Sequence, residues 1–387
     1  TCQETPTLYT LDMGNGKERI MLISACPNWD LQRGGWDTAY SDDDGETWTE
    51  YKNHWPSFDG AEKKHTIVAM ASLVQLKDEQ GNYIQKWMGV FHDYGYVNFK
   101  SYLTFDEDGN EQWSEPERYL ADYRSIESKY GICEVGMFRS PDGKRIMALA
   151  RSDKKPNLSV MFYSDDEGKT WSKPEEMQGS LAGERHKAVY DPISGRLLIT
   201  FREIVYKDGK LDNNWMAGDW VAWVGTYEDL LEQNEGEYRI LIEEDWAMNA
   251  KSGDTGYAGI LVLDDGTFIM DSYGHFDEEF SKNAFESGNY NVRTDLCYIK
   301  QAKFKLGEIE NENDLIDRSA LEAKINEVKD TSAEGYTDTS YAAFAKALTD
   351  AQTVFADYSA QQIQIDEALK VLTSAFEGLE ERPVEPE

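Results

Sequence analysis

The stretch Ser41-Asp42-Asp43-Asp44-Gly45-Glu46-Thr47-Trp48 decides the fold, because it recurs as Ser164-Asp165-Asp166-Glu167-Gly168-Lys169-Thr170-Trp171. A looser copy runs from Thr104 to Gly109 and is followed by Trp113. The copies begin at residues 41, 104 and 164, so the repeat is about 60 residues long. In each copy an aspartate can accept hydrogen bonds from backbone amides, the glycine supplies a positive φ, and we expect the tryptophan to pack under the hairpin. The repeat therefore predicts a structural corner rather than a catalytic element.

Pairs of apolar strands joined by tight turns surround these corners. Val135–Phe138 and Arg145–Ala150 flank Pro141-Asp142-Gly143, and Gly259–Leu263 precedes a similar turn at Asp264-Asp265-Gly266. Short strands with turn signals every 8–12 residues or so are typical of all-β proteins. Four strands per repeat predict the blades of a β-propeller. Five units are visible, starting near residues 5, 65, 133, 186 and 257, and a sixth blade upstream of Thr1 is the alternative.

The composition changes after about residue 310, where tryptophan and Asp/Gly hairpins stop. Apolar residues then follow helical spacing, for example Leu321, Ile325 and Val328. This pattern predicts a bundle of three helices. The expected domains are a propeller over residues 1–308, a three-helix module over 312–380 and a linker tail over 381–387.

Charge and cysteine content exclude several kinds of partner. The chain of 387 residues carries 39 Lys+Arg against 73 Asp+Glu, a net charge of −34, so a nucleic acid is not an expected ligand. No apolar run of about 18 residues is long enough to cross a bilayer. Four cysteines lie far apart without a CxxC motif, which argues against zinc and favours buried free thiols over a disulfide scaffold. The Asp clusters at 42–44 and 106–108 fit turns rather than a calcium loop, so we expect no metal and no cofactor.

Polar residues gather where the predicted strands meet one end of a propeller. Each alone could be an ordinary hydrogen-bonded rim residue, but Arg, His, Glu and Tyr collected at one end favour a binding pocket over the central channel. Arginines in so acidic a chain indicate a local site for an anionic ligand. At the starts of inner strands the candidates are His65, Glu134, Arg185, His186, Asp254 and Tyr257, and at the ends of second strands they are His92, Asp93, Arg151, Arg202 and Tyr273.

The Ser-x-Asp-x-Gly-x-Thr-Trp turn resembles the Asp-box of bacterial sialidases and related propellers, and the resemblance covers roughly residues 1–308. The C-terminal region is similar to FIVAR-type three-helix modules of Gram-positive surface proteins, on Tyr336-Thr337, Ala347-Leu348 and Gln361–Leu369. These resemblances imply a secreted or cell-surface protein, with cell-wall attachment through the C-terminal region. We expect it to act as a monomer on a glycan.

The sialidase resemblance also implies roles for residues. Tyr257 would be the nucleophile and Glu134 its base, while Arg151, Arg185 and Arg202 would hold a substrate carboxylate. From their positions at the blade ends, His65, His92, His186, Asp254 and Tyr273 are expected to complete the binding site. Asp93 is the candidate acid/base from its position. The family's Phe-Arg-Ile-Pro motif is absent. Two hypotheses follow: an exo-sialidase-like glycoside hydrolase, and a non-catalytic carbohydrate-binding or adhesion propeller.

Overall fold

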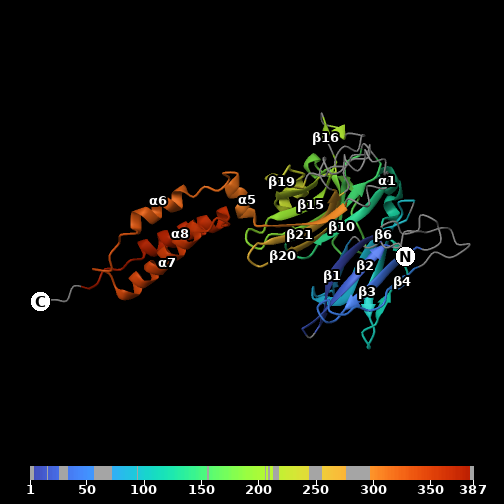
Figure 1. Cartoon of the computed structure of the whole chain (residues 1–387), viewed down its shortest axis with the longest axis horizontal. Helices are drawn as coiled ribbons and strands as arrows, with labels where there is room; N and C mark the ends of the chain where they lie inside the picture. Colours follow the sequence, from blue (N-terminus) through green and yellow to red (C-terminus); the bar gives the residue numbers. More distant parts are fainter. Residues whose placement is uncertain are drawn as a thin grey trace, which may run out of the picture. The chain divides into compact units, whose positions relative to one another are not determined.

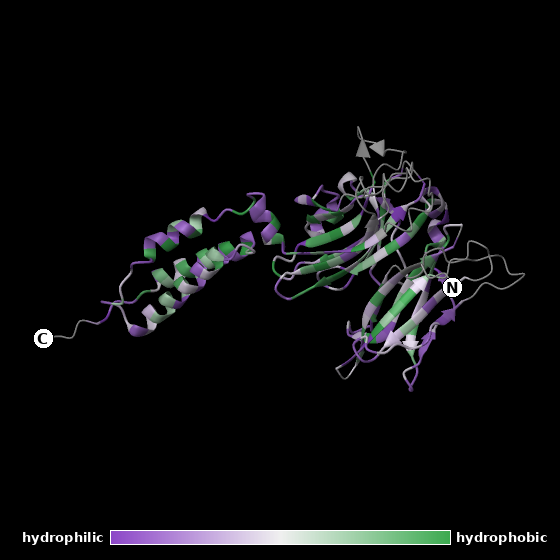
Figure 2. Cartoon of the chain, in the orientation of Figure 1, coloured by the Kyte–Doolittle hydropathy of each residue, from purple (hydrophilic) through white to green (hydrophobic). Residues whose placement is uncertain are grey.

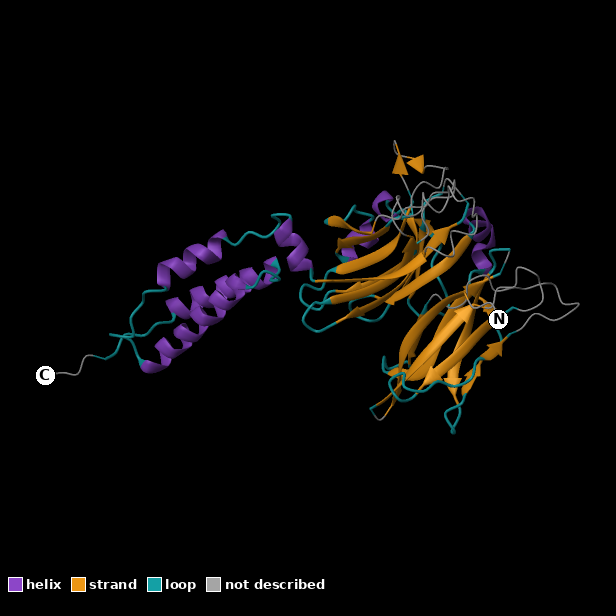
Figure 3. Cartoon of the chain, in the orientation of Figure 1, coloured by secondary structure: helices purple, strands orange, loops and turns teal. Residues whose placement is uncertain are grey.

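The computed structural model describes residues 4–14, 16–25, 34–55, 72–93, 95–154, 157–204, 206–207, 210–211, 218–243, 255–275 and 297–383. Five antiparallel sheets follow one another along the chain and form the blades of a β-propeller, and helices follow them (Figures 1 and 3). The mainly-β fold and the five visible units are confirmed.

Blades 1 and 2 come from the N-terminal third of the chain. Blade 1 consists of β1 (Glu4–Gly14), β2 (Lys17–Ala25), β3 (Trp36–Ser41) and β4 (Lys52–His54). Blade 2 consists of β5 (Leu73–Lys77), β6 (Tyr83–His92), β7 (Asn98–Phe105) and β8 (Glu111–Trp113), and β9 (Glu117–Arg118) also pairs with β7. A short 3-10 turn (Ala121–Tyr123) and α1 (Arg124–Tyr130) lead to the next blade.

Blades 3 to 5 repeat the same order of strands. Blade 3 is β10 (Ile132–Arg139), β11 (Ile146–Ser152), β12 (Val160–Ser164) and β13 (Glu175–Glu176). Blade 4, after a 3-10 turn (Gly179–Leu181), is β14 (Gly183–Tyr190), β15 (Leu197–Glu203), β18 (Trp220–Gly225) and β19 (Tyr238–Glu243), with the small hairpin β16 (Tyr206–Lys207) and β17 (Lys210–Leu211) inserted. In blade 5 the described strands are β20 (Gly256–Val262), β21 (Phe268–His275) and β22 (Cys297–Phe304).

The repeated motif forms the same corner between the third and fourth strands of blades 1 and 3. Asp43 and Asp166 each accept a 2.8 Å hydrogen bond from the amide of the threonine four residues on. The predicted corner is therefore present. Of the two full copies, the packing predicted for the tryptophan holds in the second: Trp171 is 7% exposed against Tyr119 and Phe162, whereas Trp48 is 41% exposed. In the looser copy Trp113 is partly buried and packs on Trp36. The prediction was wrong for Trp48.

The corner takes a different form in blade 4. There α2 (Tyr227–Glu232) follows β18, and a capping box closes its first turn. The Thr226 side chain accepts from the Asp229 amide, and the Asp229 carboxylate accepts from the Thr226 amide. The same two residue types thus hold a helix start instead of a glycine turn.

Apolar side chains fill the spaces between neighbouring blades. One core joins Val90 of blade 2 to Ile132 of blade 3, and another joins Leu149 of blade 3 to Ile199 of blade 4. Figure 2 shows the corresponding hydrophobic segments along the strands. Because each core takes residues from two blades, the blades pack face to face. Cys133 is a free, buried thiol, while Cys2 and Cys26 lie outside the described residues.

The chain forms two compact units. The first contains residues 1–190, 196–260 and 270–301, and the second contains 191–195, 261–269 and 302–387. In the second unit α5 (Leu306–Glu312) precedes α6 (Ser319–Val328), α7 (Asp338–Ala356) and α8 (Gln362–Glu377). The last three helices bury Leu321, Phe344 and Leu372 in a core of their own. Within the described residues no helix has the length and apolarity needed to cross a bilayer.

Candidate functional site

Three residues of successive inner strands share an unusual backbone conformation. Glu134 of β10, Arg185 of β14 and Tyr257 of β20 have φ angles of +48°, +63° and +51°. On β10 and β14 these residues lie in register shifts that mark β-bulges. Each such left-handed non-glycine residue costs on the order of 1–3 kcal/mol, so the surrounding structure must hold it in place. Strain repeated at the same point of three blades marks this end of the propeller as a candidate site.

Two glycines bring these three strands close together. A Cβ atom on Gly136 would lie 2.0 Å from the carbonyl oxygen of His186, so glycine is needed where β10 passes β14. Gly256 has a φ of +123°, and a Cβ there would lie 2.7 Å from Cδ of Arg185. Glycine at these positions therefore lets Glu134, Arg185 and Tyr257 meet.

Tyr257 and Glu134 form a short hydrogen bond at the centre of the site. The Tyr257 hydroxyl donates to Oε1 of Glu134 at 2.6 Å. The Arg185 guanidinium lies over the Tyr257 ring, 4.1 Å from its centroid. Burial raises the pKa of Tyr257 well above its usual value, and the nearby Arg185 only partly opposes this. Tyr257 is therefore a neutral phenol in the resting site.

Glu134 is held as a carboxylate although its side chain is only 5% exposed. Burial raises its pKa, but the charges of Arg151 and Arg185 outweigh burial and lower the pKa to about 2. Its second oxygen, Oε2, makes no hydrogen bond within the described part of the chain and lies 3.4 Å from Arg185 Nε. The carboxylate thus keeps a lone pair that can take a proton.

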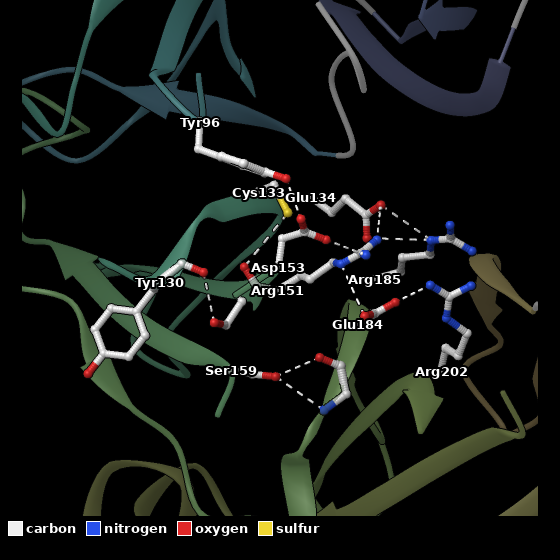
Figure 4. A network of polar contacts seen from close by, with 12 residues as sticks. Tyr96, Tyr130, Cys133, Glu134, Arg151, Asp153, Ser159, Glu184, Arg185 and Arg202 are labelled. Atoms are coloured by element: carbon white, nitrogen blue, oxygen red, sulfur yellow. Dashed lines mark hydrogen bonds and ion pairs between the residues drawn. The ribbon is translucent and has the colours of Figure 1, made fainter. Parts of the chain in front are cut away.

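Arg151 of β11 binds three carboxylates at once (Figure 4). Its Nη1 lies 3.0 Å from Glu134, its Nη2 2.6 Å from Asp153 and its Nε 3.1 Å from Glu184. Arg202 of β15 donates to the other oxygen of Glu184. Arg185 donates to the Thr255 carbonyl oxygen and to the Tyr273 hydroxyl. The structure therefore brings the three predicted arginines together, each already paired with protein groups.

Of the remaining predicted residues, His92, His186 and Asp93 have the following surroundings. The His92 ring stacks on Tyr96 with 5.9 Å between centroids, and burial lowers the pKa of His92. His186 packs on Phe201, and burial lowers the pKa of His186 to about 4. Asp93 accepts hydrogen bonds from the amides of Gly95 and Val97 in a tight turn. His65 and Asp254 lie outside the described residues.

Three residues of the network were not among the predicted site residues: Tyr96, Asp153 and Glu184. Glu184 precedes Arg185 in the bulge of β14. Because Arg185 corresponds to Glu134 and Tyr257 on the neighbouring inner strands, its neighbour Glu184 could have been included among the candidates. Asp153 lies two residues after Arg151, directly after the end of β11. Tyr96 is held in a loop of blade 2 with a φ of +52°, and no local pattern indicates its partner, 57 residues away.

No metal site is evident in the part of the chain that the structure describes, because no group of three or more His, Cys, Asp and Glu residues there is arranged to hold an ion.

Comparison with known proteins finds proteins that are similar to this chain but assigns it to no family. No family model matches the chain. Lacto-N-biosidase of Bifidobacterium longum subsp. longum is 39% identical over 72 residues, which are 19% of this chain and only 4% of that protein.

Similar solved structures share less sequence. A protein of unknown function from Dyadobacter fermentans has a TM-score of 0.47 and 17% identity, over 70% of this chain and 72% of that one. The intramolecular trans-sialidase from Ruminococcus gnavus has a TM-score of 0.38 and 15% identity, over 61% and 45%. An exo-1,5-alpha-L-arabinanase from a bovine ruminal metagenomic library has a TM-score of 0.40 and 12% identity, over 72% and 89%. The similar structures thus include sialidases and other glycosidase propellers.

Proposed function

We propose that the protein is a glycoside hydrolase that cleaves a terminal acidic sugar, with Tyr257 as nucleophile and Glu134 as its base. The observation that carries this proposal is the 2.6 Å hydrogen bond from the neutral Tyr257 phenol to the ionised, buried Glu134 carboxylate. The local sequence match to a protein named lacto-N-biosidase agrees with an enzyme that acts on glycans.

The pair can form and release a covalent intermediate. Tyr257 Oη attacks the anomeric carbon while its proton passes to Glu134, and the bond from that carbon to the leaving oxygen breaks. Water then attacks the same carbon, and Tyr257 leaves and recovers its proton from Glu134. A neutral phenol approaches an anionic sugar without charge repulsion, which is why a Tyr/Glu pair suits an acidic substrate better than a carboxylate nucleophile.

The arginines supply recognition of the sugar carboxylate in this proposal. Guanidinium groups match a carboxylate in shape and charge. Arg185, whose guanidinium lies over the Tyr257 ring, would hold the reacting sugar. Arg151 and Arg202 flank it through Glu184, so a substrate carboxylate would share or exchange their present partners. Secretion and cell-wall attachment through the helical module remain predictions.

Turnover of a methylumbelliferyl sialoside and of a glycan panel tests the proposal. Tyr257→Phe removes only the nucleophilic oxygen, and we expect turnover to fall by at least about 100-fold. Tyr190→Phe is the matched control, because Tyr190 donates to the Arg139 carbonyl oxygen at the opposite end of its strand. A Tyr257→Phe variant as active as the native protein would contradict the assignment. Glycan binding without product release would point instead to a carbohydrate-binding propeller.

A further inference from the structure

The corner of blade 3 carries an arginine with one nitrogen to spare. Nε and Nη2 of Arg145 donate to the two carboxylate oxygens of Asp165 at 2.7 and 3.0 Å, and the guanidinium lies 3.7 Å from the centroid of the Tyr163 ring. These contacts fix the plane of the guanidinium. The third nitrogen, Nη1, makes no hydrogen bond to a residue that the structure describes, and the Arg145 side chain is 28% exposed.

Blade 1 contains the same arrangement, but there it is closed. Arg19 binds both carboxylate oxygens of Asp42 at 2.7 and 2.8 Å and lies 3.7 Å from the centroid of the Tyr40 ring. Its Nη1 donates at 2.7 Å to the carbonyl oxygen of Gly109, a residue in the corner of blade 2, and the Arg19 side chain is only 7% exposed. The corner of the next blade therefore uses the nitrogen that Arg145 leaves unused.

The corner of blade 3 stays open because blade 4 has no equivalent turn. Blade 4 continues from its third strand into the capped helix α2, so no corner carbonyl oxygen reaches Arg145. A cavity of about 600 Å³ remains beside the turn between β10 and β11, at the opposite end of blade 3 from Glu134. The polar residues that line it come from blade 3 and from the start of α2, and they include Asp142, Lys144, Arg145, Asp165, Tyr227 and Glu228.

Two further polar groups in the cavity lack a partner. Tyr227 is 8% exposed, yet its buried hydroxyl makes no hydrogen bond within the described part of the chain. Burial raises the pKa of Tyr227, and the charge of the neighbouring Arg145 only partly opposes this, so the hydroxyl stays protonated. The exposed carboxylate of Glu228 makes no ion pair with any residue that the structure describes. A buried hydroxyl without a partner is costly, so the Tyr227 hydroxyl indicates a ligand.

The charges around the cavity fit a neutral ligand. Three acidic residues, Asp142, Asp165 and Glu228, outnumber the two basic residues, Lys144 and Arg145. This excess of acid disfavours an anion, unlike the candidate active site with its three arginines. No group of acidic or His and Cys residues in the described ranges is arranged to hold a metal ion. Unpaired donors beside unpaired acceptors suit the hydroxyl groups of a sugar, because each hydroxyl both donates and accepts.

We propose that this cavity between blades 3 and 4 is an accessory binding site for a neutral sugar. The Tyr227 hydroxyl and Arg145 Nη1 donate to hydroxyl oxygens of the sugar, and the Glu228 carboxylate accepts from neighbouring hydroxyls. The volume lies within the range of small-molecule sites, roughly 300–1,000 Å³, and suits a mono- or disaccharide. The site does not depend on the proposed hydrolysis, because none of its residues belongs to the candidate active site.

Titration of the full chain with neutral sugars, followed by ligand-observed NMR, tests the proposal. The probes are galactose, glucose, mannose, N-acetylglucosamine and lactose, with N-acetylneuraminic acid and calcium chloride for comparison. We expect at least one neutral sugar to bind, and we expect its Kd to rise about 2- to 10-fold in Tyr227→Phe and about 10-fold or more in Glu228→Gln. Tyr130→Phe is the matched control, since Tyr130 is also 8% exposed but precedes β10 at the other end of blade 3.

Both variants should fold, because Tyr227→Phe removes a hydroxyl without a partner and Glu228 is exposed. The proposal would be overturned if no neutral sugar binds, if the Kd is unchanged in either variant, or if only N-acetylneuraminic acid or calcium binds at this cavity. A sugar whose Kd rises in Tyr257→Phe instead occupies the candidate active site, which would also overturn it. Binding is measured without turnover, so an inactive protein would refute the proposed function but not this site.

Discussion

Arg151 is the residue on which the site depends most, because it links carboxylates from three positions. Its side chain is 11% exposed and contacts Glu134, Asp153 and Glu184. Buried charges are tolerated only when paired, so the three carboxylates and the three arginines of this site require one another. This mutual dependence explains why strained backbone persists at Glu134 and Arg185.

Acid should weaken the fold through Glu134. Its pKa is about 2 in the folded protein and 4.5 in an unperturbed side chain, so folding favours the ionised form. The resulting stabilisation, about 3 kcal/mol, is fully present above pH 4.5 and is lost as the pH falls towards 2. We expect the free energy of unfolding of the native protein, measured with urea, to fall over this pH range. The free energy of unfolding of Glu134→Gln should change less with pH over the same range.

The same variant should be less stable at neutral pH, by about 3–5 kcal/mol, because Arg151 and Arg185 lose a buried counter-charge. Other carboxylates with lowered pKa, such as Asp166, titrate in both proteins and cancel from the comparison. If the free energy of unfolding of Glu134→Gln falls with pH as steeply as that of the native protein, Glu134 is not the group responsible.

At the scale of elements, the repeated corner illustrates how context changes the use of one motif. The Ser-Asp-Gly-Thr hydrogen bonds are the same in blades 1 and 3, since they depend only on residues within the turn. The following tryptophan depends on what lies beneath it. Trp171 lies against Tyr119 at 5.3 Å between ring centroids, whereas the Trp48 indole donates to the Gly45 carbonyl oxygen and stays largely exposed.

Truncating the two tryptophans should therefore have very different effects. Trp171→Ala leaves a cavity in the core between blades 2 and 3 and should cost about 3–5 kcal/mol. Trp48→Ala, at the equivalent exposed position, should cost less than about 1 kcal/mol. Denaturant unfolding of both variants measures the difference. Similar losses of stability in the two variants would mean that the contribution of each tryptophan depends on the corner itself and not on the core beneath it.

Sequence reasoning succeeded where the determinants are local. Strand pairs, tight turns and the box at 164–171 follow from neighbouring residues, and the same strand pattern put Glu134, Arg185 and Tyr257 near matching strand starts. It missed what depends on contacts between blades. Tyr96 meets Asp153 only after two blades pack. In blade 4 a short helix stands after the third strand because Thr226 and Asp229 bond each other in its capping box.

At the scale of the whole molecule, the helical bundle has a hydrophobic core separate from those of the blades. Its buried residues, among them Leu321, Phe344 and Leu372, all come from residues 321–372. Among the described residues, the three clusters between blades 1 to 4 contain residues up to Leu230. Separate cores predict separate cooperative units, so calorimetry of the full chain should show two unfolding transitions.

Leu372→Ala tests this directly, because Leu372 is fully buried in the bundle. The cavity should cost about 2–5 kcal/mol and lower only one transition temperature. Ile363→Ala on the same helix α8 is the control, since Ile363 is 49% exposed and its loss should leave both transitions nearly unchanged. Trp171→Ala should lower the other transition. If Leu372→Ala and Trp171→Ala instead shift one common transition, the two units fold as a single cooperative body, and the bundle stabilises the blades that carry the site.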